Sequence, residues 1–232
     1  MPPRALEPAG VALVDKPAGP SSFAIVAQIR RVTRARTGHA GTLDPFATGL
    51  LVVLSGRATK IAPCLVGLDK RYTTDIDLTA RTSTGDPEGE IVERCAAPGS
   101  AELERRLERL RGEIELPIPA ASAVKIGGER AYRLARRGVE VEMPLRRSTV
   151  HSLDVITYIG DAGCVTSVTL DLRVSSGTYV RAIAHALGGH CRTLRRTEVG
   201  PLTVDAAVAP DAFEPSLLVP EAEVLARIGV AA

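Results

Sequence analysis

Apolar and polar residues alternate along the chain in short blocks, which predicts brief strands and helices in succession. The apolar run at residues 11–14 predicts a buried strand, and turn-forming residues then lead into a helix over about residues 23–32. Residues 38–49 hold too many glycines and threonines for a regular element. They are therefore expected to form a loop that leads into a second apolar strand over residues 50–54.

Later segments continue this alternation, with several strands following one another directly. Helices are predicted over residues 57–66, 100–110, 179–187 and, as a short basic helix, around Tyr132. Further strands are predicted over residues 71–79, 149–158 and 165–174. Directly successive strands favour a mixed sheet flanked by helices over a doubly wound parallel sheet, so the predicted fold class is α+β.

Composition adds a size and a domain organisation to this fold class. A chain of 232 residues with 45% hydrophobic residues can bury one substantial core. We expect one main domain over residues 1–204 and a short acidic extension, not a second domain, over residues 205–232. No apolar stretch approaches the roughly 20 residues that span a bilayer, which predicts a cytoplasmic protein that binds no membrane.

The four cysteines are far apart in the sequence, which argues against a zinc site or a disulfide framework. They are expected to be buried free thiols: Cys64, Cys95, Cys164 and Cys191.

Charge is distributed unevenly. The net charge is +2, yet residues 205–232 carry five acidic residues and one basic residue, which leaves +6 on the residues before them. Basic residues cluster within residues 30–36, 70–71 and 130–137, as in proteins that bind polyanions. Solvated helix faces explain such clusters equally well, so charge alone does not decide the partner.

One carboxylate, Asp44, lies in the glycine-rich loop and is followed by Pro45, which restricts the backbone. Local pattern alone favours an ordinary turn aspartate. If Asp44 attacks carbon, it must stay ionised where water is partly excluded, and a nearby arginine would achieve this. Arg181 is the candidate, and Tyr72 and Tyr179 are candidates for contact with a base or for proton transfer.

Other chemistries find little support. The chain has no Gly-x-Ser-x-Gly motif, and its four histidines match no known catalytic order. The spacing of His185, His190 and Cys191 matches no common zinc pattern. No phosphate-binding loop or dinucleotide fingerprint is present, so neither a metal nor a nucleotide cofactor is predicted.

Five motifs together resemble the bacterial tRNA pseudouridine-55 synthases, the TruB family. They lie, in the family's order, at residues 15–19, 38–49, 70–72, 122–125 and 177–181. The resemblance covers about residues 11–204, and the motif around Asp44 is its most specific part. It implies a mixed, mostly antiparallel β-sheet with flanking helices, a central catalytic cleft and no cofactor.

The resemblance also implies a reaction, in which uracil is detached from ribose, rotated and rejoined through C5. Asp44 matches the catalytic aspartate, which attacks either the ribose or the base. Arg181 matches the arginine that pairs with this aspartate, and Tyr72 matches the tyrosine that stacks on the target base. The remaining residues that the resemblance assigns to substrate binding are Lys16, His39, Lys125, Tyr179 and Leu194.

The implied substrate is the T-arm of tRNA, from which the target uridine must be flipped out. His39 is expected to replace the flipped base. Residues 117–147 correspond to the family's RNA-gripping insertion. Its expected contacts to the RNA backbone are Arg130, Arg133, Arg136 and Arg137.

The chain departs from the family pattern in three places. The segment from Gly188 to Leu194 is shorter, the helix after Arg181 lacks an acidic residue, and residues 205–232 are too few and too acidic for the usual C-terminal RNA-binding (PUA) domain. We expect a monomer without an obligate protein partner.

Three alternatives stay open at this point. They are a non-catalytic chaperone of the T-arm, a related synthase that acts on another RNA, and an unrelated carboxylate enzyme such as a glycosidase. The last would need a carboxylate pair, for which Asp75 and Asp77 are the available residues.

Overall fold

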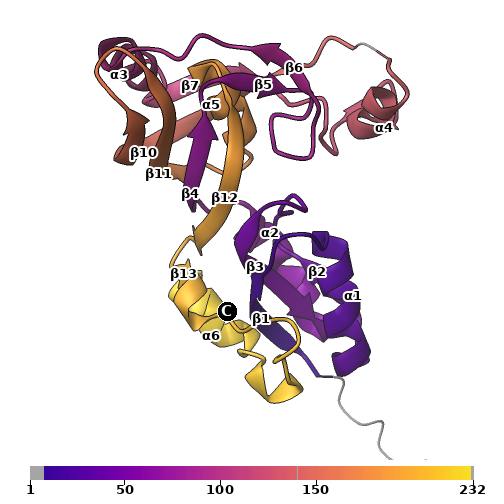
Figure 1. The fold of residues 1–232 in the computed structure, drawn as a ribbon. Helices are drawn as coiled ribbons and strands as arrows, with labels where there is room; N and C mark the ends of the chain where they lie inside the picture. The colour runs from indigo at the N-terminus through magenta and orange to yellow at the C-terminus, as the bar shows by residue number, and fades with distance from the viewer. Residues whose placement is uncertain (1–7, 140, 231–232) are drawn as a thin grey trace, which may run out of the picture. The chain divides into compact units, whose positions relative to one another are not determined.

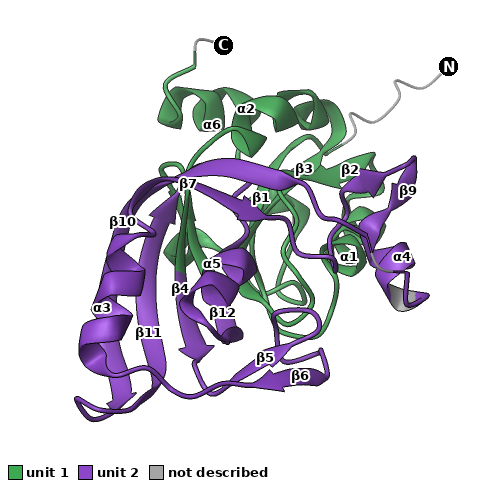
Figure 2. Cartoon of the chain, turned by 90° about the horizontal axis from the view of Figure 1, so that it is seen from above, with its two compact units in different colours: residues 1–72, 195–232 green, residues 73–194 purple. Residues whose placement is uncertain are grey.

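The computed structural model describes residues 8–139 and 141–230. The chain forms two compact units (Figure 2). Unit 1 comprises residues up to Tyr72 and from Arg195 onward, and unit 2 comprises Thr73–Leu194. Both boundaries fall inside strands, one in β4 (Lys70–Asp77) and one in β12 (His190–Val199), so these two strands belong to both units.

Unit 1 is built around β3 (Thr48–Ser55), whose residues after Thr48 are all buried. On one side, β1 (Gly10–Lys16) pairs with it antiparallel, from Gly10↔Ser55 to Lys16↔Gly49. Strand β2 (Thr37–His39) pairs antiparallel with the end of β3, and β12 pairs parallel with its start. The short β13 (Leu202–Thr203) extends β12.

Helix α1 (Ser22–Thr33) packs on β2 and β3 (Figure 1), and it buries one apolar face. Its N-terminus forms because the Ser21 hydroxyl accepts a hydrogen bond from the Ala24 amide, which satisfies an otherwise free N–H of the first turn. Ile25, Val26 and Ile29 then recur at helical spacing on the buried face.

The helix predicted over residues 57–66 is two elements. A 3₁₀ helix, η1 (Gly56–Ile61), precedes α2 (Ala62–Val66). Pro63 explains the break, because proline has no N–H to continue the preceding turn but is favoured in the first turn of a new helix.

The last residues of the chain belong to unit 1. They form η2 (Val204–Ala206), η3 (Pro215–Leu217) and α6 (Glu221–Arg227). Single bridges join Val11 to Val219 and Val14 to Val208, and Val224 of α6 is buried. The acidic extension thus packs against β1, while the predicted domain boundary at residue 204 stays a prediction.

Unit 2 carries the sheet order β12-β4-β11-β10-β7. Its sheet and two larger helices are β7 (Gly112–Pro117), β10 (Leu145–Gly160), β11 (Val165–Val174), α3 (Ser100–Glu108) and α5 (Val180–Leu187). Smaller elements are the hairpin β5 (Ala80–Thr82) with β6 (Ile91–Arg94), the hairpin β8 (Lys125–Ile126) with β9 (Glu129–Arg130), and α4 (Ala131–Arg136). β10 pairs antiparallel with both β11 and β7.

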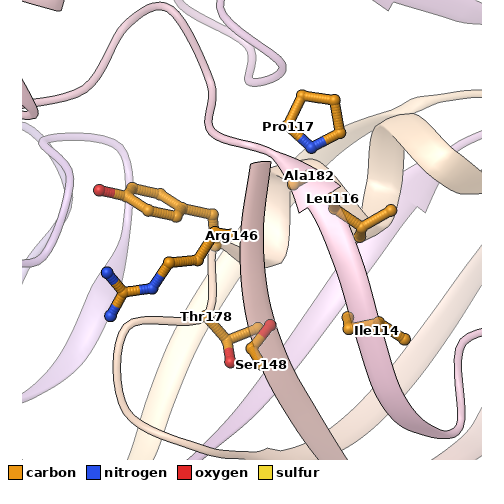
Figure 3. A pocket seen from close by; sticks show the side chains of 8 residues that line it. Ile114, Leu116, Pro117, Arg146, Ser148, Thr178 and Ala182 are labelled. Atoms are coloured by element: carbon orange, nitrogen blue, oxygen red, sulfur yellow. The ribbon is translucent and has the colours of Figure 1, made fainter. Parts of the chain in front are cut away.

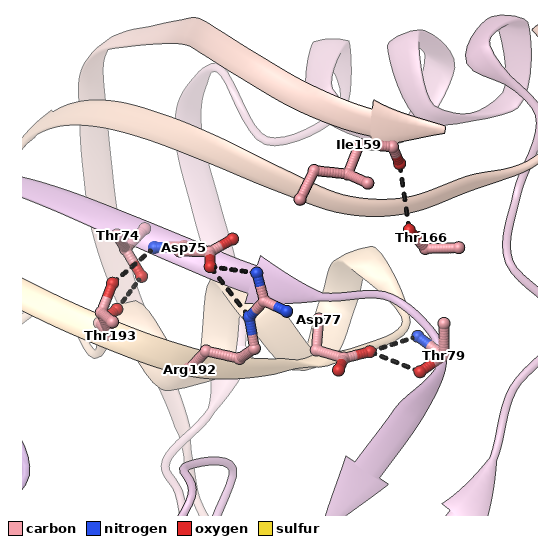
Figure 4. Close-up of polar contacts among 8 residues, drawn as sticks. All are labelled: Thr74, Asp75, Asp77, Thr79, Ile159, Thr166, Arg192 and Thr193. Atoms are coloured by element: carbon pink, nitrogen blue, oxygen red, sulfur yellow. Dashed lines mark hydrogen bonds and ion pairs between the residues drawn. The ribbon is translucent and has the colours of Figure 1, made fainter. Parts of the chain in front are cut away.

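Side chains join β4 to β12 inside unit 2 (Figure 4). The Thr74 hydroxyl donates to the Thr193 carbonyl (2.7 Å), and the Thr193 hydroxyl accepts from the Asp75 amide (3.2 Å). Arg192 donates from Nε and Nη2 to Oδ2 of Asp75, at 2.8 and 2.5 Å. These contacts fix the register of two strands that differ by over 100 positions in sequence.

The predicted fold class is confirmed: a mixed, mostly antiparallel sheet with flanking helices. The cysteines are free as predicted, but the expectation that all are buried is wrong. Cys191 is buried, whereas Cys64 and Cys164 are exposed, since one lies on the outer face of α2 and the other in the turn before β11. In the described part of the chain, no helix is long and apolar enough to cross a membrane.

Candidate active site

Lys16 binds the backbone of the loop that carries Asp44. This lysine is completely buried, and its ammonium donates to the carbonyls of Pro45 (3.0 Å) and Ala47 (2.6 Å) in the loop and of Pro17 (2.9 Å). The Gly19 amide adds a further bond to the Pro45 carbonyl. These contacts turn the charged end of Lys16 into the loop, and substrate binding by Lys16 stays a prediction.

Arg196 holds the other side of the same loop. Its side chain is 1% exposed, and its guanidinium donates to the carbonyls of Leu50 (2.8 Å), Gly41 (3.0 Å) and Thr42 (3.5 Å). Arg196 was not among the predicted site residues. The planar five-donor guanidinium suits this task, because one side chain can bind carbonyls that point from different parts of a loop.

Between these two cations, Ser22 fixes the residue next to Asp44. Its hydroxyl donates to the Leu43 carbonyl and accepts from the Leu43 amide, both at 2.8 Å. Asp44 itself is half-buried, and its carbonyl accepts from the Ala47 amide. The clamp formed by Lys16, Ser22 and Arg196 therefore holds the backbone on both sides of the carboxylate.

Gly49 allows β3 and β12 to approach each other at the end of this loop. Its φ is +99°, and a Cβ there would lie 2.2 Å from the Arg196 carbonyl oxygen. Only glycine combines this backbone conformation with this close approach. The same residue thus brings the Arg196 backbone within reach of the loop.

His39 lies at the start of the loop, on β2, with its ring edge-to-face against Phe23 (5.4 Å between centroids). Burial and, secondarily, the charge of Arg196 lower the pKa of His39 below its ordinary value. The imidazole is therefore neutral at pH 7, and its recorded contact is the ring contact with Phe23 and not an ion pair.

In unit 2, Arg181 is buried at the start of α5 and is held by several contacts. Its guanidinium donates to the carbonyls of Thr84 (2.7 Å) and Ala121 (2.9 Å), and it lies 3.4 Å from a carboxylate oxygen of Asp86. Asp86 is itself oriented by the Thr84 hydroxyl (2.5 Å) and the Glu88 amide (3.0 Å). Asp86 was not among the predicted site residues, so its pairing with Arg181 was missed.

The other predicted contact residues are distributed over both units. Tyr72, buried on β4, belongs to unit 1, and Leu194, buried on β12, belongs to unit 2. Tyr179 precedes α5 and lines a small pocket of unit 2. Figure 3 shows that pocket, whose side chains come from β7, β10, α5 and the segment just before α5. Its lining residues are Ile114, Leu116, Pro117, Arg146, Ser148, Thr178, Tyr179 and Ala182.

The predicted RNA-gripping insertion contains β8, β9 and α4. Lys125 lies opposite Arg130 in the strand register of the β8–β9 hairpin, and both side chains are exposed. Arg133 and Arg137 are also exposed, although Arg137 is paired with Glu129 at 2.8 Å. The side chain of the predicted Arg136 lies outside the described part of the structure.

The carboxylates that a glycosidase would need are engaged in other contacts (Figure 4). Asp75 is paired with Arg192, and Asp77 accepts from the amide and hydroxyl of Thr79 at 2.7 and 2.6 Å. Burial alone would raise the pKa of Asp77, but these bonds and the neighbouring charges hold it below its ordinary value. Asp77 is therefore an ionised structural acceptor and not a general acid.

Comparison with known proteins decides the family. Residues 30–180 match the TruB family pseudouridylate synthase (N terminal domain). The chain is 43% identical over 219 residues to tRNA pseudouridine synthase B of Mycobacterium sp. (strain KMS), covering 90% of this chain and 73% of that protein. The chain belongs to the TruB family. The family's activity, isomerisation of uridine to pseudouridine, is the activity of this enzyme.

A second relative supports TruB membership, and a solved structure has a similar fold. The protein of the same name from Thermobifida fusca (strain YX) is 45% identical over 214 residues, covering 87% of this chain and 73% of that protein. A solved chain titled "Crystal Structure of a Cbf5-Nop10-Gar1 Complex" has a TM-score of 0.69 at 24% identity, covering 94% of this chain and 62% of that one. At that identity, the second likeness concerns the fold alone.

Proposed function

We propose that this TruB family enzyme isomerises uridine 55 in the T-loop of tRNA, with Asp44 as its catalytic nucleophile. The names of its relatives support tRNA as the substrate. The observation that carries the choice of Asp44 is the clamp on its loop, in which Lys16, Ser22 and Arg196 bind the backbone on both sides. Such a clamp suits covalent catalysis, because a nucleophile accelerates a reaction only when it is held in the reactive geometry.

The roles of the other catalytic residues rest on the match to the family's motifs. Arg181 is the proposed partner that keeps Asp44 ionised, and Tyr72 is the proposed aromatic that stacks on the target base. The buried pairing of Arg181 with Asp86 supports the role of Arg181, since the pairing holds the guanidinium in one orientation. The reaction rearranges bonds within one nucleotide, so the proposal requires no cofactor.

The remaining predicted site residues are assigned to the flipping of the target base and to the binding of the RNA around it. Extruding a base from a folded loop costs a few kcal/mol, which protein contacts must offset. The neutral His39 is the proposed substitute for the extruded base, and Tyr179 and Leu194 are proposed to contact the flipped nucleotide. Contacts to the RNA backbone are assigned to the exposed bases of the insertion, namely Lys125, Arg130, Arg133, Arg137 and, from its motif position, Arg136. The enzyme is expected to act as a single chain.

The test uses an unmodified tRNA transcript, with pseudouridine mapped at each position. Wild type should convert position 55, and Asp44→Asn should convert none while binding the transcript with unchanged affinity, because binding does not need the ionised oxygen. Asp211→Asn is the matched control, since it makes the same chemical change at an exposed aspartate of unit 1.

Conversion at another position only would refute the proposed target. Activity in Asp44→Asn would refute the proposed nucleophile. Tight binding by wild type without any conversion would favour the non-catalytic RNA chaperone.

A further inference from the structure

The outer face of α1 combines one aromatic side chain with three arginines. Phe23, Arg30 and Arg34 follow one another at spacings of seven and four residues, which places them along one side of the helix and its cap. Arg31 lies beside them, and the Phe23 side chain is 74% exposed. We call these four residues the α1 face.

The arginines of the α1 face have no ion-pair partner among the carboxylates of residues 8–139 and 141–230. Three other surface arginines of unit 1 do have one: Arg57 pairs with Glu221, Arg71 with Glu198 and Arg195 with Asp15. The exposed Arg36, two residues after Arg34, has none among the described residues. The α1 helix itself contains no acidic residue. The negative end of the helix dipole stabilises basic residues in the last turn, but only by a modest amount and without occupying their side-chain donors.

Arg34 also has an unusual backbone. As the C-cap of α1 it adopts φ 51° and ψ 24°, and it is the only non-glycine residue with positive φ among those described. Glycine is favoured at such a cap because it lacks a Cβ, and asparagine because its short polar side chain can hydrogen-bond to the nearby backbone. An arginine in this position therefore indicates a use for its side chain that the backbone does not explain.

Phe23 stands at the other end of the α1 face, in contact with His39. The two rings meet at 77° with their centroids 5.4 Å apart. An exposed phenyl ring has no packing function on its open side, and it offers a surface on which a nucleic acid base can stack. From Phe23 to Arg34, eleven residues of helix span about 16 Å, which is several nucleotides at about 3.4 Å per nucleotide of a stacked strand.

We propose that the α1 face is an RNA-binding surface, in which Arg30, Arg31 and Arg34 bind consecutive phosphates and Phe23 stacks on a base beside His39. This rests on the proposed function, since it assigns a second grip to the same RNA substrate. The α1 face lies in unit 1, on elements separate from the insertion in unit 2. The charge complementarity between uncompensated arginines and phosphates is the physical basis of the assignment.

The test measures binding of the tRNA transcript by fluorescence anisotropy between 50 and 200 mM KCl. The first variant combines Arg30→Gln, Arg31→Gln and Arg34→Gly. It should weaken binding at least about tenfold and lower the slope of log K against log salt by about 2–3, which corresponds to three lost phosphate contacts. Phe23→Ala should weaken binding by about fivefold or more with an unchanged slope, because stacking releases no counterions.

A matched control removes three arginines that are each paired with a glutamate three or four residues earlier in the sequence. The substitutions are Arg105→Gln, Arg111→Gln and Arg227→Gln. This control has the same net charge as the first variant and should keep the affinity and the salt slope of wild type. Arg34→Gly alone separates folding from binding, because glycine suits the cap: its melting temperature should not fall below that of wild type, while its affinity should.

Wild-type affinity and slope in both the triple variant and Phe23→Ala would overturn the inference, even if wild type converts position 55. An equal loss of slope in the control would also overturn it, because the effect would then be one of net charge. If wild type binds RNA through the α1 face but converts no uridine, the proposed function fails and this inference stands. Absence of RNA binding by wild type would overturn both.

Discussion

Replacing Lys16 by methionine tests whether this residue holds the Asp44 loop or contacts substrate. Methionine has nearly the same length but cannot donate, so the carbonyls of Pro17, Pro45 and Ala47 would lose their bonds to the ammonium. Each hydrogen bond to a charged group contributes about 1.5–3 kcal/mol, and the relieved burial of the charge offsets part of the sum. We therefore expect a loss of about 3–5 kcal/mol in the free energy of unfolding.

For a chain of this size, 1 kcal/mol changes the melting temperature by about 2–4 °C, so Lys16→Met should melt about 6–20 °C lower than wild type. The assay combines thermal unfolding followed by circular dichroism with steady-state kinetics at a temperature where the variant is folded. kcat should fall, because the loop would no longer hold Asp44 in one geometry, and KM should change little.

Lys70→Met is the matched control. Lys70 is also buried in unit 1, but its ammonium donates to the carbonyls of Val66 and Leu68, away from the Asp44 loop. This variant removes a buried ammonium in the same way, yet it should keep the kcat of wild type. The reasoning is refuted if Lys16→Met keeps the wild-type melting temperature and raises KM alone, which is the behaviour of a residue that only binds substrate.

Three further predictions follow from individual contacts. Asp86→Asn should lower kcat by about tenfold or more, equivalent to about 1.4 kcal/mol, because Arg181 loses its buried charge partner. The affinity for RNA should not change. A kcat equal to that of wild type would show that Asp86 is not part of the site. Gly49→Ala should reduce stability by about 1–3 kcal/mol from backbone strain alone, and more through the contact with the Arg196 carbonyl, as measured by urea unfolding. Burial lowers the pKa of Lys70 from 10.5 to about 8, so between pH 8 and 10.5 the unfolded chain binds more protons than the folded chain. The free energy of unfolding should therefore rise with pH across that window in wild type and not in Lys70→Met. Parallel pH profiles of the two proteins would contradict this.

Much of the fold is local enough to be predicted from the sequence. The predicted strand over residues 165–174 has the observed bounds of β11, and the helix predicted over residues 23–32 differs from α1 by one residue at each end. In both, side-chain periodicity and flanking turn residues agree with the tertiary structure. Glycines and a proline likewise marked the Asp44 loop, although residues 38–39 and 48–49 of the predicted loop belong to β2 and β3.

Strand β12 shows the limit of this approach. Its sequence is His-Cys-Arg-Thr-Leu-Arg-Arg-Thr-Glu-Val, which reads as a polar segment, and no strand was predicted there. Its pairing with β3 and the burial of Arg196 depend on carbonyls about 150 positions earlier in the chain. No pattern within β12 contains that information.

The sequence alone indicated the family, the α+β fold class and the loop that carries the candidate nucleophile, because each is marked by short motifs or by the order of elements along the chain. Only the tertiary structure decided that Lys16 and Arg196 are buried loop-holding cations and that Arg181 is paired with Asp86. The physical reason is that a charged side chain can be buried only where donors and acceptors from distant segments converge on it, and that convergence exists only in the folded chain.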